Sequence, residues 1–413
     1  MKRRVVVTGM GMVTPLGHNV NDTIEALNNG ENGIDSIKLF DTSNSKVKIA
    51  GEVKDIDFSN YMDRKDVKRS DRFTNLGLVA AIEAYNQADL EKDRNQIDPY
   101  RFGTYVASGI GGLNTIFEET TILLEKGPHR MSPFFIPKAI INLLGANISI
   151  KFKTNGPNIP IVTACSAATN AIGEAYKAIK DGYLDIAFAG GSEASINELG
   201  VGGFASLRAL STNEDPTKAS KPFDKNRDGF VIGEGAGILI LEEYELAKAR
   251  GAKILAEIVG YGTTSDANHI TAPEETGASV TKAINLAIED AKIKHTDIGY
   301  INAHGTSTEL NDKIETLAIK NAFKEHAYNI NISSTKSMLG HSLGATGAVE
   351  SIVIVKALET GIIPPTINYE TKDSECDLNY TPNKAVKRDF DYGLNMNLGF
   401  GGQNAVLIFK KGE

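Results

Sequence analysis

Cys165 has the residue type and the surroundings of a nucleophile. It lies where an apolar stretch typical of a strand, residues 159–163, turns into an alanine-rich helix. The start of a helix carries partial positive charge, which favours the thiolate form of a cysteine placed there. The unpaired backbone N–H groups of such a turn can also stabilise an oxyanion. The alternative is that Cys165 is a small buried apolar residue without reactivity.

Two histidines lie in loops of small residues that each follow an expected strand. His304 belongs to NAHGTST (residues 302–308), and His341 belongs to GHSLGATG (residues 340–347). A single histidine is usually structural, but two in matching strand-end loops, together with Cys165, indicate one catalytic cleft. No such setting surrounds the other histidines: His18, His129, His269, His295 and His326.

The segment GFGG at residues 399–402 places three glycines around Phe400. Glycine permits backbone conformations that other residues rarely adopt. The segment therefore predicts either a mobile loop whose aromatic ring moves or a tight hairpin with a buried ring, and the sequence leaves both open.

Motifs for other chemistries are absent or incomplete. DKNRDG at residues 224–229 begins like a calcium loop, but its twelfth position is Gly235 instead of glutamate. GEGAG at residues 233–237 does not match GxGxxG and precedes an expected strand, so it does not indicate a dinucleotide site. There is no GxxxxGK[ST] motif and no CxxC or Cys/His spacing of a structural zinc site, so we expect no metal.

Composition narrows the class of protein. A chain of 413 residues predicts two core-forming units, and its net charge of −8 argues against nucleic-acid binding. Two cysteines, Cys165 and Cys376, fit a reducing compartment. No uninterrupted apolar run is long enough for membrane insertion. The basic N-terminus leads into apolar residues 5–7 that glycine and proline soon interrupt, which indicates a first strand instead of a signal peptide. We expect a cytoplasmic protein.

The expected elements occur twice in the same order. Each half has an opening strand that ends in glycines, a helix followed by a strand, a second strand that turns into a helix, and a closing glycine-rich strand pair. The segments are 5–11, 76–90, 102–107, 159–181 and 229–242 in the first half, and 254–262, 280–293, 298–303, 330–359 and 395–409 in the second.

This alternation predicts an α/β protein. The helix at residues 345–359 is apolar almost all round, which is typical of a helix buried between layers. A duplicated unit with such helices gives a five-layer α-β-α-β-α fold. We expect the halves to be residues 1–250 and 251–413, with insertions in the first near residues 111–158 and 195–228.

These residues resemble the β-ketoacyl-acyl-carrier-protein synthases, a family with the thiolase fold. The likeness rests on TACSA (163–167), NAHGTST, Lys336 with GHSLGA (340–345), GFGGQN (399–404) and the segment PFDKNRDGFVIGEGAG (222–237), and it covers nearly the whole chain. The last segment accounts for the incomplete calcium loop.

The resemblance implies a role for each matching residue. Cys165 accepts an acyl group from a carrier-protein thioester, and the backbone N–H groups of Cys165 and Phe400 bind the oxyanion. His304 and His341 bind the thioester oxygen of malonyl carrier protein while carbon dioxide leaves. Lys336 and Glu350 match residues that pair and support the histidines. Thr306 and Thr308 match residues that bind the pantetheine arm, and no cofactor is implied.

Finer features indicate the elongating, type II members of the family. Ile110 matches an isoleucine that gates a long acyl pocket there, and Phe204 and Phe400 match further pocket residues. A polyketide ketosynthase would have nearly the same residues and stays open as an alternative. The other alternative is a catalytically silent thiolase-fold scaffold, against which the complete set of Cys165, His304, His341 and Lys336 argues.

Basic residues predict the partner surface. Arg64, Lys65, Lys68, Arg69 and Arg72 cluster on an otherwise acidic chain, and Arg130 and Arg208 match family positions at the substrate mouth. Carrier proteins are acidic, so we expect acyl carrier protein to dock at Lys65, Lys68, Arg69, Arg130 and Arg208. A solvated helix face is the alternative for this cluster. The resemblance also implies a homodimer.

Overall fold

The chain forms two halves, which a computed structural model describes over residues 3–413. The strands of the first half are β1 (Val5–Val13), β4 (Phe102–Ala107), β5 (Asn158–Ile161), β6 (Ile186–Glu193) and β7 (Gly235–Glu243), with a small pair, β2 (Asp35–Ser36) and β3 (Ile49–Ala50). Its helices are α1 (Val20–Asn29), α2 (Arg64–Lys68), α3 (Arg72–Gln87), α4 (Leu113–Lys126), α5 (Phe135–Ala139), α6 (Leu143–Phe152), α7 (Ala167–Lys180), α8 (Glu198–Ser206) and α9 (Tyr244–Ala249).

The second half repeats the succession without the long insertions. Its strands are β8 (Ala256–Ser265), β9 (Ile298–Asn302), β10 (Asn331–Ser333), β13 (Tyr392–Gly399) and β14 (Gln403–Lys411), with a small pair, β11 (Ile362–Ile363) and β12 (Val386–Lys387). Its helices are α10 (Ala278–Ala291), α11 (Glu309–Phe323), α12 (Lys336–Leu339) and α13 (Thr346–Thr360).

The sheet shows the duplication directly. The first half runs β5-β4-β6-β7-β1 and the second runs β10-β9-β13-β14-β8, so each strand occupies the place of its counterpart. The two runs join where residues 5–7 of β1 pair antiparallel with residues 256–258 of β8. The predicted boundary at residue 250 falls between α9 and β8 and stays a prediction.

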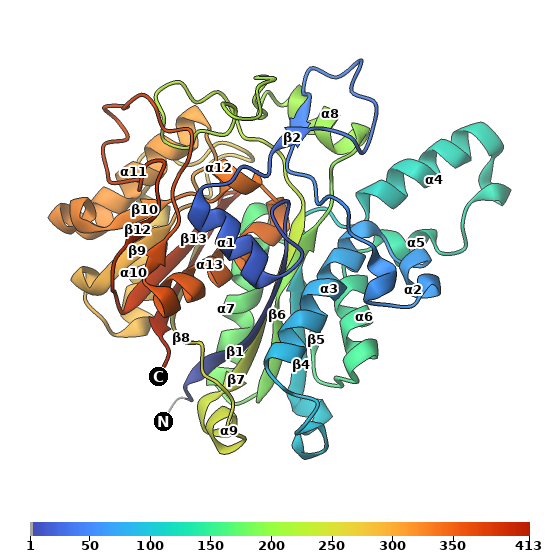
Figure 1. The fold of residues 1–413 in the computed structure, drawn as a ribbon, viewed down its shortest axis with the longest axis horizontal. Coiled ribbons are helices and arrows are strands. Elements are labelled where there is room, and N and C mark those ends of the chain that lie inside the picture. The colour runs from blue at the N-terminus through green and yellow to red at the C-terminus, as the bar shows by residue number, and fades with distance from the viewer. Residues whose placement is uncertain (1–2) are drawn as a thin grey trace.

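Three layers of helices alternate with the two five-stranded runs of the sheet (Figure 1). α7 and α13 lie between the runs, where α7 contacts β4 and β6 and α13 contacts β7 and β13. α3 covers the outer face of the first run, α10 covers the outer face of the second, and α11 packs beside α10. The predicted α-β-α-β-α architecture is confirmed.

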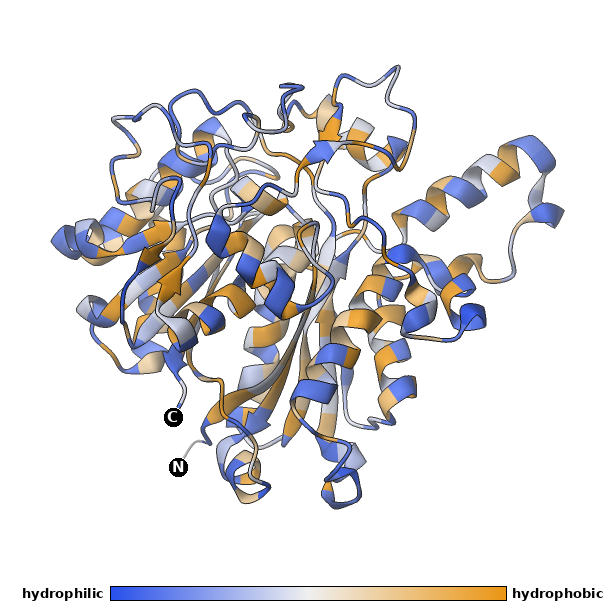
Figure 2. Cartoon of the chain, viewed as in Figure 1, coloured by the Kyte–Doolittle hydropathy of each residue, from blue (hydrophilic) through white to orange (hydrophobic). Residues whose placement is uncertain are grey.

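Apolar residues concentrate on the strands and on the helix faces that meet them (Figure 2). α13 is the clearest case: nearly every residue from Thr346 to Leu358 is buried, as its all-round apolar sequence predicts. No helix among residues 3–413 is long and apolar enough to cross a membrane.

One predicted strand begins later than expected. The strand expected from residue 229 starts at Gly235, and its antiparallel partner is β6, which the periodicity analysis did not identify. The residues before Gly235 have other partners: Phe230 bridges to Leu210, and Ile232 bridges to His341. This segment therefore supports a candidate catalytic loop instead of extending the sheet.

Glycines in the N-terminal strand of each half let a helix approach the sheet closely. A Cβ atom added at Gly11 of β1 would lie 1.8 Å from the Ala80 carbonyl oxygen in α3. A Cβ atom at Gly262 of β8 would lie 2.1 Å from the Ala283 carbonyl oxygen in α10. Both halves thus use the same backbone contact to hold the outer helix on the sheet.

We expect Gly262→Ala to lower the free energy of unfolding by about 1–3 kcal/mol, because the added methyl group forces α10 away from β8. Gly202→Ala is the control, since a Cβ atom there would meet nothing within 4 Å. Equilibrium denaturation of both variants checks this. Equal stabilities would show that β8 and α10 tolerate the extra atom.

Candidate active site

The turn that carries Cys165 connects β5 to α7. Residues Ala164–Ser166 form a 3-10 turn, and the Ser166 hydroxyl donates to the Thr163 carbonyl at 2.8 Å. Gly399, at the end of β13, lies against this turn: a Cβ atom there would be 2.7 Å from the Thr163 carbonyl oxygen. The second half therefore reaches the nucleophile through a glycine that no larger residue can replace without displacing the turn.

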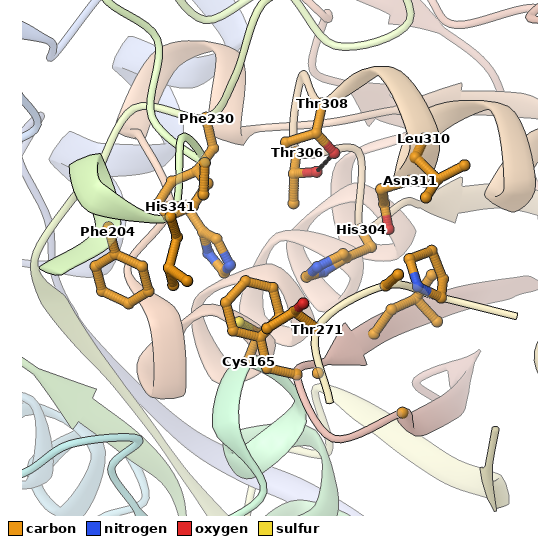
Figure 3. Close-up of a pocket in the computed structure, with 18 of the residues that line it drawn as sticks. Cys165, Phe204, Phe230, Thr271, His304, Thr306, Thr308, Leu310, Asn311 and His341 are labelled. Atoms are coloured by element: carbon orange, nitrogen blue, oxygen red, sulfur yellow. Dashed lines mark hydrogen bonds between the residues drawn. The ribbon is translucent and has the colours of Figure 1, made fainter. Parts of the chain in front are cut away.

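Cys165, His304 and His341 meet in one cavity (Figure 3). The Cys165 sulfur and one nitrogen of each histidine all lie within 4.8 Å of one another. The imidazole rings are nearly perpendicular, with centroids 5.3 Å apart. The cavity has a volume of about 400 Å³, and Phe204, Thr306, Thr308 and Phe400 also line it.

His304 follows β9 and is held through its backbone. Its N–H donates to Glu315 Oε1 at 2.5 Å, and the Gly305 N–H donates to Glu315 Oε2 at 2.7 Å. Asn397 Nδ2 lies 3.5 Å from His304 Nδ1. Because Asn397 Nδ2 carries only donors, this contact favours Nδ1 as the acceptor and places the ring proton on Nε2.

His341 follows α12 and keeps one nitrogen unpaired. Its backbone N–H donates to the Val231 carbonyl at 2.7 Å, and its ring nitrogen Nδ1 lies 3.0 Å from Thr346 Oγ1. Its Nε2 is buried and has no hydrogen-bond partner among the described residues. A buried polar atom without a partner is costly, so this nitrogen is a natural contact for a substrate.

A buried polar network lies behind the histidines. Lys336 and Glu350 are 2% and 1% exposed at their side chains, and Lys336 Nζ lies 2.5 Å from Glu350 Oε1. Asn397 Nδ2 donates to Glu350 Oε2 at 2.7 Å, and Asn397 Oδ1 accepts from the Thr169 hydroxyl. The pair predicted from the resemblance is thus formed, and Asn397 connects it to His304.

Burial sets the protonation of the histidines. It holds the pKa values of His304 and His341 well below the usual range, and the positive charge of Lys336 acts in the same direction. Both rings are therefore neutral near pH 7. They can act as hydrogen-bond donors or as proton acceptors, but not as resting cations.

The thiolate expected from the helix start is not what the structure supports. Burial in apolar surroundings raises the pKa of Cys165 to about 11. The charge of Lys336 and the backbone N–H groups of Phe400 and Cys165 act in the opposite direction without overcoming it. The resting residue is a thiol, because the loss of water around the half-buried sulfur disfavours the anion.

The two backbone N–H groups predicted as an oxyanion hole, those of Phe400 and Cys165, both act to lower the pKa of the Cys165 thiol and therefore lie near its sulfur. A carbonyl carbon bonded to that sulfur would place its oxygen near the same donors. The assignment as an oxyanion hole stays a prediction.

The residues predicted to bind the acyl chain lie together. Ile110, Phe204 and Cys165 all pack against one apolar cluster that includes Phe230 and Leu343. Phe204 and Phe400 have ring centroids 6.5 Å apart. Thr306 and Thr308, predicted to bind pantetheine, lie on the opposite wall of the cavity with their hydroxyls 2.9 Å apart (Figure 3).

The predicted docking residues occupy three places. Lys65, Lys68 and Arg69 are exposed on α2 or directly after it. Arg208 is exposed and lines the cavity. Arg130 lies in the short turn Pro128–Arg130 between α4 and α5, on a hairpin that projects from the body (Figure 1).

Arg72 does not belong to this exposed basic surface. It donates to Glu234 Oε1 and Oε2 at 2.6 and 2.8 Å, and the Glu234 side chain is fully buried. Its charge is therefore neutralised inside the protein. Of the basic residues that cluster in the sequence, Arg72 does not contribute to the exposed positive charge.

Sequence reasoning did not find three buried polar residues: Glu193, Glu315 and Asn397. Glu315 lies inside α11 and Asn397 inside β13, where a polar side chain on a buried face is the available signal. Burial raises the pKa of Glu315 to about 8. Their partners come from distant segments, so their roles follow only from the fold.

Comparisons with known proteins agree with the site. The family model "Beta-ketoacyl synthase, N-terminal domain" matches residues 2–247, and "Beta-ketoacyl synthase, C-terminal domain" matches residues 255–370. The chain is 49% identical to "3-oxoacyl-[acyl-carrier-protein] synthase 2" of Synechocystis sp., over 99% of this chain and 98% of that protein. It is 48% identical to the Staphylococcus aureus protein of the same name, over 100% and 99%.

Solved structures share the fold. A β-ketoacyl synthase from Burkholderia phymatum superimposes with a TM-score of 0.93 at 35% identity and covers 100% of both chains. A chain of the AntDE:AntF complex, a type II PKS acyl-carrier protein with its ketosynthase bound to the hexaketide, superimposes with a TM-score of 0.91 at 34% identity, also over 100% of both chains.

The raised pKa of Cys165 predicts the pH dependence of its alkylation. A thiol with a pKa near 11 has a thiolate fraction that rises about tenfold per pH unit from pH 7 to 10. The rate of iodoacetamide labelling of Cys165, followed by intact-protein mass spectrometry with Cys165→Ala as the blank, should rise in the same way. A rate that levels off below pH 8 would instead support the thiolate expected from the helix dipole.

Proposed function

The chain belongs to the β-ketoacyl synthase family, and we propose that it condenses an acyl group held on Cys165 with malonyl carrier protein, giving a 3-oxoacyl carrier protein and carbon dioxide. The observation that carries this proposal is the meeting of Cys165 with two neutral histidines in one cavity. The similarity to named 3-oxoacyl synthases supports fatty acid elongation as the setting.

In the first half-reaction, the Cys165 sulfur attacks the thioester carbonyl of an acyl carrier protein. The thiol proton passes to His341 Nε2, which has no other partner, and then to the departing pantetheine sulfur. His341 Nε2 can accept this proton when the ring proton of His341 lies on Nδ1. The contact between Nδ1 and the Thr346 hydroxyl allows this, because either group can be the donor in it. The N–H groups of Cys165 and Phe400 bind the oxyanion formed on the way.

In the second half-reaction, malonyl carrier protein occupies the same cavity. His304, whose ring proton lies on Nε2, donates to the thioester oxygen. His341 adds a second donor in the tautomer that carries its proton on Nε2, with Nδ1 accepting from the Thr346 hydroxyl. The bond to the carboxylate breaks, carbon dioxide leaves, and the electron pair forms an enolate. The enolate carbon attacks the acyl carbonyl, the bond to Cys165 breaks, and the thiolate takes up a proton from solvent because the thiol is its resting form.

Lys336 and Glu350 act behind the reacting atoms. Their ion pair keeps the positive charge of Lys336 near both histidines. Asn397 donates to Glu350 and contacts His304, so it holds His304 in place relative to the ion pair. Burial, and with it the charge of Lys336, keeps the rings from becoming cations and leaves them as neutral donors. We therefore assign the ion pair a supporting role rather than a contact with substrate.

We also propose an elongating, long-chain type. Ile110, Phe204 and Cys165 pack against the same apolar cluster, and such apolar surroundings suit an alkyl chain. A polyketide role is the second candidate, since one solved neighbour at 34% identity is the ketosynthase partner of a type II PKS acyl-carrier protein. The higher identity to 3-oxoacyl synthases, 48–49%, favours fatty acid elongation.

We propose a homodimer that forms along β5. This strand is at the edge of the sheet, and its region exposes Ile159 and Val162 by 42% and 51%. An exposed apolar edge strand is an association site unless it is covered. We also propose a cytoplasmic location, because a reducing compartment keeps the free thiol of Cys165 available.

The acyl-enzyme is the first test. Incubation with a medium-chain acyl carrier protein should add the mass of one acyl group to the native chain and none to Cys165→Ala, because the sulfur is the acceptor. Intact-protein mass spectrometry measures both. The absence of an adduct with acyl groups of several lengths would overturn the acyltransferase proposal and favour a silent scaffold.

Carrier docking is tested by charge reversal. The double variant Lys65→Glu and Arg69→Glu should raise KM for carrier-bound substrate about tenfold, because the exposed cations on α2 would repel an acidic partner. Kinetics with acyl-pantetheine, which has no carrier, should not change. Lys384→Glu with Lys387→Glu changes the net charge equally at exposed positions of the second half. If the control pair raises KM as much as the α2 pair does, α2 is not the docking site.

A further inference from the structure

Glu193, the last residue of β6, is a carboxylate enclosed by hydrogen-bond donors. It is 0% exposed. It accepts from the Ser108 hydroxyl at 2.8 Å and from the backbone N–H groups of Gly109, Ile110 and Gly344 at 2.6, 3.2 and 3.0 Å. No ion pair with Glu193 is found within residues 3–413.

Burial raises the pKa of Glu193, and the hydrogen bonds from Ser108, Gly109, Gly344 and Ile110 act against that effect. The arrangement of donors fits an ionised carboxylate. Every one of these groups donates, and a carboxylate with two oxygens has lone pairs for several donors. A protonated acid would direct its own O–H at one of them. Buried charges persist when hydrogen bonds satisfy them, and backbone N–H groups replace the usual cation here.

The hydrogen bonds to Glu193 join two loops. These loops can touch because glycines lie where they meet. A Cβ atom at Gly344 would lie 2.1 Å from the Gly109 nitrogen, and one at Gly109 would lie 2.8 Å from Glu193 Oε2. The first loop, residues 108–111, carries Ile110. The second follows His341 and leads into α13. Glu193 therefore fixes two adjoining loops, one that carries Ile110 and one that follows His341, with one side chain.

The negative charge of Glu193 also acts on the nucleophile. It is one of the causes that raise the pKa of Cys165, after burial and against the effect of Lys336. The charged groups that act on the thiol are thus Lys336 and Glu193, with the neutral rings of His304 and His341 beside it.

We propose that Glu193 is a positioning residue that holds Ile110 beside Cys165 and so determines how long an acyl chain the enzyme accepts. This inference rests on the proposed function, since it concerns the acyl group that Cys165 receives. It goes beyond that function by identifying what sets the position of Ile110.

The surroundings of Ile110 predict how replacement of Glu193 changes the preference for acyl-chain length. Its side chain already packs against the apolar cluster that contains Val201, Phe230 and Leu343. If the carboxylate no longer holds the backbone at residues 109–111, burial of apolar surface draws Ile110 further into that cluster. A long chain would then lose its space, whereas a short chain that ends before Ile110 would not.

The test compares acylation of Cys165 by four-carbon and twelve-carbon acyl carrier proteins. In Glu193→Gln, kcat/KM for the twelve-carbon substrate should fall about tenfold or more relative to the four-carbon substrate. Glu52→Gln is the matched control, because Glu52 is also buried and accepts two backbone N–H groups, from Lys38 and Leu39. An equal fall for both substrates would reduce Glu193 to a structural residue and overturn the proposal.

A second measurement separates charge from shape. Glu193→Gln removes the negative charge near Cys165, so iodoacetamide labelling of the thiol at pH 8 should become faster. Glu193→Asp keeps the charge but not the reach, so it should label at the native rate and still lose the twelve-carbon substrate. Native labelling by Glu193→Gln would contradict an ionised Glu193.

Thermal unfolding shows which variants fold. If Glu193→Gln does not fold, Ser108→Ala removes one donor from the enclosure and should shift the chain-length ratio in the same direction by a smaller factor. An unchanged ratio in Ser108→Ala would then overturn the proposal. Failure of the native protein to accept any acyl group would instead overturn the proposed function, and the labelling measurement would still report on Glu193.

Discussion

The close contact between the two central helices is the constraint on which the site depends. α7 begins after Cys165 and α13 begins after His341. At their starts, a Cβ atom on Gly347 would lie 2.0 Å from the Thr169 hydroxyl. Because a larger residue cannot fit there, the helix starts meet at backbone distance, and the nucleophile of one half lies beside a histidine of the other.

Desolvation is the second common factor. The same burial raises the pKa of Cys165 and lowers the pKa values of His304 and His341, so the free site holds a thiol and two neutral rings. Charge is confined to places where it has partners, such as the ion pair of Lys336 and the donors around Glu193. Neutral groups enclosed in a cavity are suited to stabilising negative charge that develops only during reaction.

Periodicity predicted much of the fold. The helix expected at residues 345–359 is α13, and the strand expected at residues 102–107 is β4. β6 was not identified, although its residues are buried throughout, because a continuous apolar run with glycines has no alternation to detect. Arg72 looked like a surface charge because its partner, Glu234, is distant in sequence.

The repeated order of elements and the residue types that carry the chemistry can be read from the sequence, because both are local properties of the chain. The turns and glycines around Cys165, His304 and His341 mark these residues as candidates. The groups that surround them follow from the fold. Protonation depends on burial and on charges from distant segments, so the neutral thiol, the Asn397 link and the Glu193 enclosure follow from packing and not from the order of residues.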